Sequence, residues 1–211
     1  MTRSETLDIV AAHRGDAALV VGPGANSGLL YVRCDSPASL YNMDMAYSAP
    51  VGLGIALARP DRKVLVVEGE GSFFAGSTVL STIWRMRPKN LLVLVTDNGV
   101  WGTGDGREPS ATAYGVDLSA LALASGWEQK HVHFCGQAAA LSDELSLAMR
   151  QEGPHFFVCK NEAAADENLG SGSKRPRPQR HILDCAVLMR HALRGDDGSP
   201  KPLPEASPDG G

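Results

Sequence analysis

Four continuous apolar runs recur along the chain at regular intervals. They lie at residues 17–21, 63–67, 90–95 and 155–160. Runs without polar alternation are typical of strands covered on both faces, as in a parallel sheet. The pattern therefore predicts a buried, mostly parallel sheet.

Helical patterns separate these runs. Residues 49–58 form a short segment of small apolar residues, and residues 74–87 place their apolar side chains largely along one side. Asp117 is a predicted N-cap for a further helix, and residues 137–150 form another amphipathic segment. Strand and helix thus alternate over residues 15–162, which predicts a doubly wound α/β fold with helices on both faces of the sheet.

The C-terminal part of the chain has a different character. We expect one α/β domain over residues 1–165, then a linker and a C-terminal helix over residues 166–194. Residues 181–193 have helical periodicity and are expected to dock on the body or on a partner. Residues 195–211 are rich in proline and glycine and almost free of apolar side chains, so we expect a disordered tail.

Composition narrows the class of protein. With 211 residues and 43% hydrophobic content, the chain can bury a sizeable core. A net charge of -4 gives no general attraction to nucleic acid or to an anionic membrane, and no segment has the ~20 apolar residues of a membrane span. We expect a cytoplasmic protein that binds neither nucleic acid nor membrane. The four cysteines are scattered, without zinc-finger spacing.

Glycine-containing stretches follow the predicted strands. In open α/β sheets ligands bind beyond the carboxyl ends of the strands, where glycine lets the backbone approach a phosphate closely. No Walker loop occurs, and the dinucleotide fingerprint is only partly matched. These stretches contain no lysine or arginine, so a bound diphosphate would need a metal ion held by acids. The stretches are residues 22–28, 42–54, 69–72 and 97–106.

Two of these stretches carry a recognisable motif. Gly69-Glu70-Gly71-Ser72, 25 intervening residues and then Asn98-Gly99 resemble the thiamine diphosphate motif Gly-Asp-Gly...Asn-Asn. The spacer is one helix and one strand, so a right-handed crossover brings the two halves to the same edge of the sheet. The resemblance implies that Glu70, the Asn98 side chain and the Val100 carbonyl bind Mg²⁺. It also implies that Gly69, Gly71 and Ser72 contact the cofactor, with Ser72 at a phosphate.

The flanking sequence is similar to the sulfopyruvate and phosphonopyruvate decarboxylases, especially to the small subunit of the two-subunit enzymes. The likeness extends over residues 17–160. By this resemblance Met45 would support the bent cofactor, the Met43 carbonyl would face the aminopyrimidine, and Asn26 and Ser27 would hold the diphosphate. Core packing is the ordinary alternative for Met45, and capping or turn roles are the alternatives for Glu70 and Asn98.

The motif departs from the family pattern in three places. Glu70 replaces the usual aspartate, Asp97 replaces the first asparagine, and residues 43–46 replace a Gly-Ser-Met-Gly segment. An extra methylene in Glu70 moves the carboxylate by more than about 1 Å, which alters the metal geometry. Asp44 places a further acid near the reacting centre, with a solvated or capping role as the alternative.

The resemblance also implies a partner. The glutamate that activates the cofactor lies on a pyrimidine-binding domain, for which this chain has no room, so no catalytic residue is assigned here. The chain is therefore interpreted as the cofactor-binding subunit of a two-subunit thiamine diphosphate-dependent 2-oxo acid decarboxylase, a lyase active only as a hetero-oligomer. A carboligase or 2-oxo acid oxidoreductase subunit, or a degenerate non-catalytic member, is the alternative. The sequence does not identify the 2-oxo acid.

Overall fold

The main element of the molecule is a parallel sheet. The computed structural model describes residues 1–102, 108–163 and 176–194. Within these residues six parallel strands lie in the order β2-β1-β3-β4-β8-β7. The predicted parallel sheet is confirmed, because the four apolar runs correspond to β1, β3, β4 and β8. The bounds are β1 Ala18–Val21, β2 Ser39–Leu40, β3 Val64–Gly69, β4 Leu91–Asp97, β7 Val132–Cys135 and β8 His155–Lys160.

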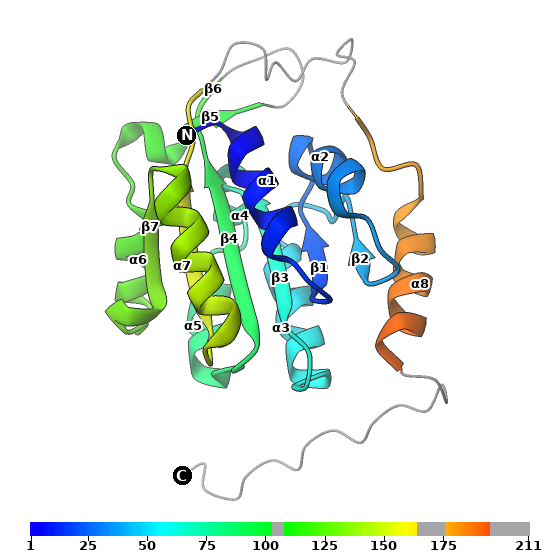
Figure 1. Ribbon diagram of the computed structural model, residues 1–211. Coiled ribbons are helices and arrows are strands. Elements are labelled where there is room, and N and C mark those ends of the chain that lie inside the picture. The colour runs from blue at the N-terminus through cyan, green and yellow to red at the C-terminus, as the bar shows by residue number, and fades with distance from the viewer. Residues whose placement is uncertain (103–107, 164–175, 195–211) are drawn as a thin grey trace, which may run out of the picture.

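Helices cover both faces of the sheet, which confirms the doubly wound architecture (Figure 1). One face carries α1 Arg3–His13, α2 Ala25–Cys34 and α7 Ala138–Arg150, and the other carries α3 Ser48–Ala58, α5 Val79–Met86 and α6 Leu118–Ala124. From β1 the chain continues to β2, toward one edge of the sheet, and from β3 it continues to β4, toward the other edge. The strand order therefore reverses between β1 and β3, and such a reversal opens a crevice at the carboxyl ends of the strands.

The core lies around the two central strands. Each residue of 64–67 in β3 and of 91–95 in β4 is 0% exposed. Helix α3 lies close to β3, since a Cβ atom added at Gly52 would come within 2.2 Å of Val66 Cγ2. The small residues of α3 are thus explained by close helix-to-sheet packing.

The helix expected over residues 74–87 is interrupted. The structure has α4 Glu70–Phe74 and then α5, joined by a turn that contains Gly76. A Cβ atom at Gly76 would lie 2.7 Å from the Ala46 carbonyl oxygen, so the turn passes directly against the loop before α3. The prediction that Asp117 caps a helix is confirmed, because its side chain accepts hydrogen bonds from the first turn of α6.

Smaller elements complete the fold. Strands β5 Val100–Trp101 and β6 Glu108–Pro109 pair antiparallel, and two 3-10 helices are η1 Ala111–Tyr114 and η2 Gln129–His131. The C-terminal helix of the structure is α8 Ile182–Arg194, which packs beside β2 at the edge of the sheet. Residues 164–175, which include much of the linker predicted to begin at residue 166, and the predicted tail, residues 195–211, lie outside the described residues.

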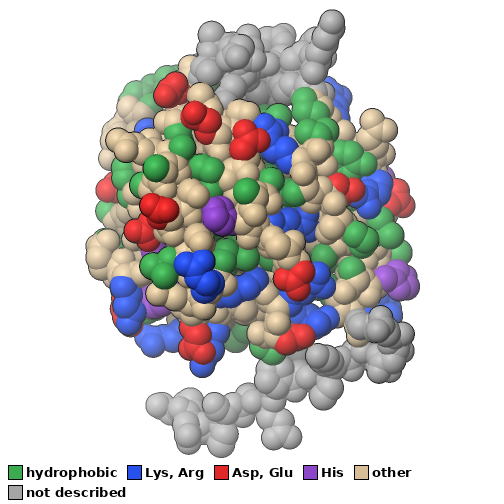
Figure 2. Space-filling view, viewed as in Figure 1, with side chains coloured by type: hydrophobic (Ala, Val, Ile, Leu, Met, Phe, Trp, Pro, Cys, Tyr) green, Lys and Arg blue, Asp and Glu red, His purple; other side chains and the backbone are tan. Residues whose placement is uncertain are grey.

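The surface over α1, α2 and α7 carries interspersed charges. Acidic and basic side chains alternate on this face without a continuous field of either sign (Figure 2). This distribution agrees with the small net charge of -4. In the described part of the chain, no helix has the length and apolar character needed to cross a membrane.

Candidate functional site

A cavity of about 270 Å³ lies at the carboxyl ends of β1, β3 and β4. The glycine-containing turn after β1, the start of α4 and the residues after β4 contribute most of its lining. Seven of the residues assigned from the sequence therefore meet in one cavity. They are Asn26, Met45, Gly69, Glu70, Gly71, Ser72 and Val100, and the other described lining residues are 3, 23–25, 96, 101 and 102.

Glu70 is the buried acid of this cavity. It is the first residue of α4, and only 2% of it is exposed. Its Oε1 atom is buried and has no hydrogen-bond partner. Burial raises the pKa of the Glu70 carboxyl, and the negative charge of Asp97 raises it further. A hydrogen bond from Ser110 and the positive charge of Arg3 act in the opposite direction. A buried carboxylate oxygen with an unfilled acceptor position is suited to a cation.

Asn26 provides a second buried acceptor. Its Nδ2 atom donates to Thr96 Oγ1 at 2.9 Å, which fixes the amide between the first turn of α2 and the end of β4. The Thr96 hydroxyl in turn donates to the Glu68 carbonyl at 3.3 Å. Asn26 Oδ1 is buried and has no hydrogen-bond partner. The cavity wall thus contains two oxygen acceptors that the described residues leave unfilled.

Ser72 lines the cavity, but its hydroxyl is hydrogen-bonded to Glu68, which is not part of the lining. Its hydroxyl donates to Glu68 Oε1 at 2.5 Å. Glu68 is 1% exposed, burial raises the pKa of its carboxyl, and the hydrogen bond from Ser72 lowers it in part. The hydroxyl hydrogen of Ser72 is therefore directed away from the cavity in this state, and a phosphate contact through this hydroxyl requires that it rotate.

Trp101 closes the cavity over Gly71. A Cβ atom at position 71 would lie 2.4 Å from Trp101 Cε3, so the indole ring rests directly on the glycine backbone. Any larger residue at this position would displace the ring. The glycine of the motif is therefore needed for the shape of the cavity.

Three residues assigned from the sequence lie behind the lining. Ser27 Oγ donates to the Gly22 carbonyl at 2.8 Å and accepts from Asn42 N at 2.8 Å, so it holds two loops together. Asn98 Oδ1 accepts from Val100 N at 3.1 Å and shapes the turn after β4. Met43 is partly buried against the core and its backbone nitrogen donates to Val21 O. Their cofactor contacts remain predictions.

Two lining or supporting residues were not found from the sequence. Arg3, from α1, lines the cavity, although its position in the chain is 67 residues away from Glu70. Ser110 reaches Glu70 because its backbone nitrogen donates to Gly99 O at 2.9 Å. The only sequence signal for Arg3 is the capping pair Thr2 and Glu5 around it, which indicates a helix start but no site.

The donor set fits a diphosphate held through a divalent cation. The unfilled Glu70 oxygen, the Asn98 amide and the Val100 carbonyl are hard oxygen ligands of the kind that Mg²⁺ prefers. In the described residues, no group of three His, Cys, Asp or Glu side chains is arranged to hold a metal ion. The metal would therefore depend on amide, carbonyl and diphosphate oxygens as well as on one carboxylate.

Comparison with known families agrees with this site. Residues 27–159 match the model for "Thiamine pyrophosphate enzyme, C-terminal TPP binding domain". This match covers more than half of the chain and contains both halves of the motif. The chain therefore belongs to the thiamine diphosphate enzyme family and contains its C-terminal cofactor-binding domain.

Individual relatives narrow the comparison. A phosphonopyruvate decarboxylase of Streptomyces viridochromogenes is 40% identical over 162 residues, which are 76% of this chain and 40% of that protein. The sulfopyruvate decarboxylase subunit beta of Methanococcus maripaludis is 29% identical over 174 residues, 80% of this chain and 91% of the subunit. The chain thus spans well under half of the first relative but nearly all of the second.

A solved structure supports the fold. The benzoylformate decarboxylase of Polynucleobacter necessarius superposes with a TM-score of 0.66 at 17% identity, covering 80% of this chain and 34% of that one. At this identity the likeness concerns the arrangement of strands and helices only.

Proposed function

We propose that this chain is the cofactor-binding subunit of a thiamine diphosphate-dependent 2-oxo acid decarboxylase of the sulfopyruvate or phosphonopyruvate type. The observation that carries the proposal is the buried Glu70 carboxylate: the residue lines the cavity, and its buried Oε1 atom has no hydrogen-bond partner. The decarboxylase relatives support this reaction class. A cytoplasmic location remains a prediction.

In this proposal Glu70, the Asn98 side chain and the Val100 carbonyl hold Mg²⁺. Asn26, Gly69, Gly71 and Ser72 would contact the diphosphate, and they line the same cavity as Met45. When bound, the cofactor would supply the electron sink for loss of carbon dioxide from a 2-oxo acid. The chain itself would bind and orient the diphosphate, while Trp101 excludes water from above Gly71.

A second subunit is part of the proposal. The match covers 91% of a sulfopyruvate decarboxylase subunit beta but only 40% of a phosphonopyruvate decarboxylase. We therefore expect that a separate pyrimidine-binding chain supplies the activating glutamate. The isolated chain should not decarboxylate 2-oxo acids such as sulfopyruvate or phosphonopyruvate, and addition of such a partner should restore turnover. Robust turnover by the isolated chain would contradict the two-subunit interpretation.

Glu70 gives the direct test of the cofactor site. Glu70→Gln keeps the size of the side chain and removes its charge, so thiamine diphosphate affinity at fixed Mg²⁺ should fall more than tenfold, roughly 1.4 kcal/mol. Glu70→Asp restores the family residue and should bind at least as well as the wild type. The matched control is Glu152→Gln, which removes an exposed acid just before the start of β8.

Calorimetric titration, with the partner present, distinguishes the alternatives. Equal affinity of the wild type and Glu70→Gln would show that the carboxylate is not a ligand. Absence of binding in every form, up to millimolar cofactor, would instead favour the degenerate, non-catalytic interpretation.

A further inference from the structure

Arg3 places a positive charge in the candidate cofactor site. The residue is 7% exposed and belongs to the first turn of α1, yet it lines the same cavity as Gly24, Asn26 and Glu70. Among the described lining residues it is the one cation, and Glu70 is the one anion.

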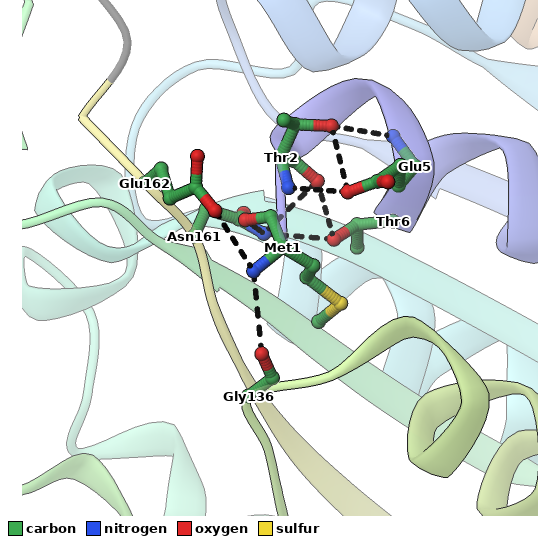
Figure 3. A network of polar contacts seen from close by, with 7 residues as sticks. All are labelled: Met1, Thr2, Glu5, Thr6, Gly136, Asn161 and Glu162. Carbon is green, nitrogen blue, oxygen red and sulfur yellow. Dashed lines mark hydrogen bonds and ion pairs between the residues drawn. The ribbon is translucent and has the colours of Figure 1, made fainter.

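The start of α1 is fixed in place by a network at the same edge of the sheet (Figure 3). Thr2 and Glu5 form a reciprocal capping box, with Thr2 N donating to Glu5 Oε2 at 2.7 Å and Glu5 N donating to Thr2 Oγ1 at 3.1 Å. Directly after β8, Asn161 Nδ2 donates to Thr6 Oγ1 at 2.8 Å. The nitrogen of Met1 donates to the Gly136 carbonyl, beyond β7, at 3.2 Å.

This network has a consequence for Arg3. The residues before and after it are bonded to segments that follow β7 and β8, so the backbone at position 3 has little freedom to move away from the cavity. Because ordering a long, flexible side chain and desolvating its charge are both unfavourable, a buried arginine requires compensating anionic or polar contacts. A bound diphosphate would add such contacts.

We propose that Arg3 binds a phosphoryl oxygen of the diphosphate group in this cavity. The inference rests on the proposed function. Mg²⁺ held by Glu70 would neutralise only part of the charge of the diphosphate, so negative charge would remain on the phosphoryl oxygens. A guanidinium offsets that charge through short, bidentate hydrogen bonds, which an ammonium group matches less well in geometry.

The alternative is that Arg3 only neutralises Glu70. In that case Arg3 would become dispensable for cofactor binding once the carboxylate is removed. A contact to the diphosphate would instead persist in a Glu70→Gln background, since it depends on the phosphoryl oxygen and not on the acid. The two roles therefore differ in a double-mutant cycle.

The test compares Arg3→Gln, Arg3→Lys and the control Arg85→Gln, which removes an exposed arginine of α5 and changes the net charge equally. Binding of thiamine diphosphate and of thiamine is measured by calorimetry with Mg²⁺ and with the partner present, as for the Glu70 variants. Arg3→Gln should weaken the binding of thiamine diphosphate at least about tenfold and leave the binding of thiamine unchanged. Arg3→Lys should recover part of the loss, and Arg85→Gln should bind as the wild type does.

The outcomes separate this inference from the proposed function. If the wild type binds thiamine diphosphate and Arg3→Gln binds it equally well, the role of Arg3 is refuted while the function stands. If the effect of Arg3→Gln disappears in the Glu70→Gln background, Arg3 is only a counter-ion. If the wild type itself does not bind up to millimolar cofactor, both the proposed function and the inference fail. Thermal unfolding of each variant shows whether a loss of binding merely reflects a loss of fold.

Discussion

Asp97 at the end of β4 and Glu70 just beyond β3 are both buried carboxylates, yet the two acids have different surroundings. Asp97, at the end of β4, accepts from Gly99 N at 3.0 Å, from Thr112 Oγ1 at 2.6 Å and from Lys160 Nζ at 3.0 Å. Glu70, just beyond β3, has an Oε1 atom without any hydrogen-bond partner. The difference indicates that Asp97 holds the fold together, whereas the proposed function assigns Glu70 to a ligand.

The partners of Asp97 belong to three separate segments. Gly99 is in the turn after β4, Thr112 is in η1, and Lys160 ends β8. By joining them, Asp97 holds the segment that brings Ser110 to Glu70. One acid is therefore a structural support for the other, although their positions in the sequence pattern are alike.

The largest expected effect comes from removing the supporting acid. Asp97→Ala leaves the hydrogen-bond donors of Gly99 and Thr112 without their acceptor and should lower the free energy of unfolding by about 3 kcal/mol. Asp97→Asn keeps an acceptor and loses mainly the pair with the partly exposed Lys160, so it should cost less than about 1 kcal/mol. Urea unfolding measures both. Equal stability of the alanine variant and the wild type would remove the distinction between the two acids.

The sequence predicted the fold more completely than it predicted the candidate site. The continuous apolar runs and the cap at Asp117 were sufficient for the sheet and several helices, because those signals are local. The break between α4 and α5 was missed because it depends on close packing of Gly76 against Ala46. Arg3 was missed for a similar reason, since only the tertiary packing of α1 brings it to the cavity.

The motif identified Glu70 and Asn98 together, but it did not distinguish their surroundings from those of Asp97. Spacing specifies which strand ends meet, and it contains no information about which donors reach each carboxylate. The bonds from Thr112 and Lys160 come from segments 15 and 63 residues further along the chain. Such partners become visible only in the folded structure.

A second prediction concerns a buried histidine at the amino ends of the strands, far from these two acids. His155, at the start of β8, is 2% exposed, and its Nδ1 atom lies 3.1 Å from His133 Nε2. Burial, with smaller contributions from His133 and His131, lowers the pKa of His155 to about 4. Between pH 6.5 and pH 4 the unfolded chain therefore binds more protons at this residue than the folded chain does, so stability falls as the pH falls.

The loss attributable to His155 should be on the order of 2 kcal/mol between pH 7 and pH 5. His155→Gln should flatten the pH profile of the urea midpoint, while His191→Gln, at an exposed position of α8, should leave its slope unchanged. Glu68 and Glu70 have the opposite sign, because carboxyls with a raised pKa contribute stability that is lost as the pH rises. An unchanged slope in His155→Gln would place the acid sensitivity elsewhere.

A smaller effect tests one arm of the Asp97 support. Thr112→Val keeps the shape of the side chain and removes the hydroxyl that donates to Asp97 Oδ1, which should cost about 1 kcal/mol. Thr112→Ser keeps the hydroxyl and should be close to the wild type. If Thr112→Ser were destabilised and Thr112→Val were as stable as the wild type, the contribution would come from the methyl group and not from the hydrogen bond.

The smallest expected effect has the opposite sign and concerns Glu70 in the absence of metal and cofactor. A buried carboxylate with an unfilled acceptor position is unfavourable for the folded state, and a neutral amide of the same size needs less solvation. Glu70→Gln should therefore stabilise the free chain at pH 7 by about 0.5 kcal/mol, even though the same change is expected to weaken cofactor binding. Urea unfolding of the free chain, with Glu152→Gln as the control, measures this gain. A clear loss of stability in Glu70→Gln would mean that this carboxylate, like Asp97, supports the fold, and the contrast between the two strand ends would no longer hold.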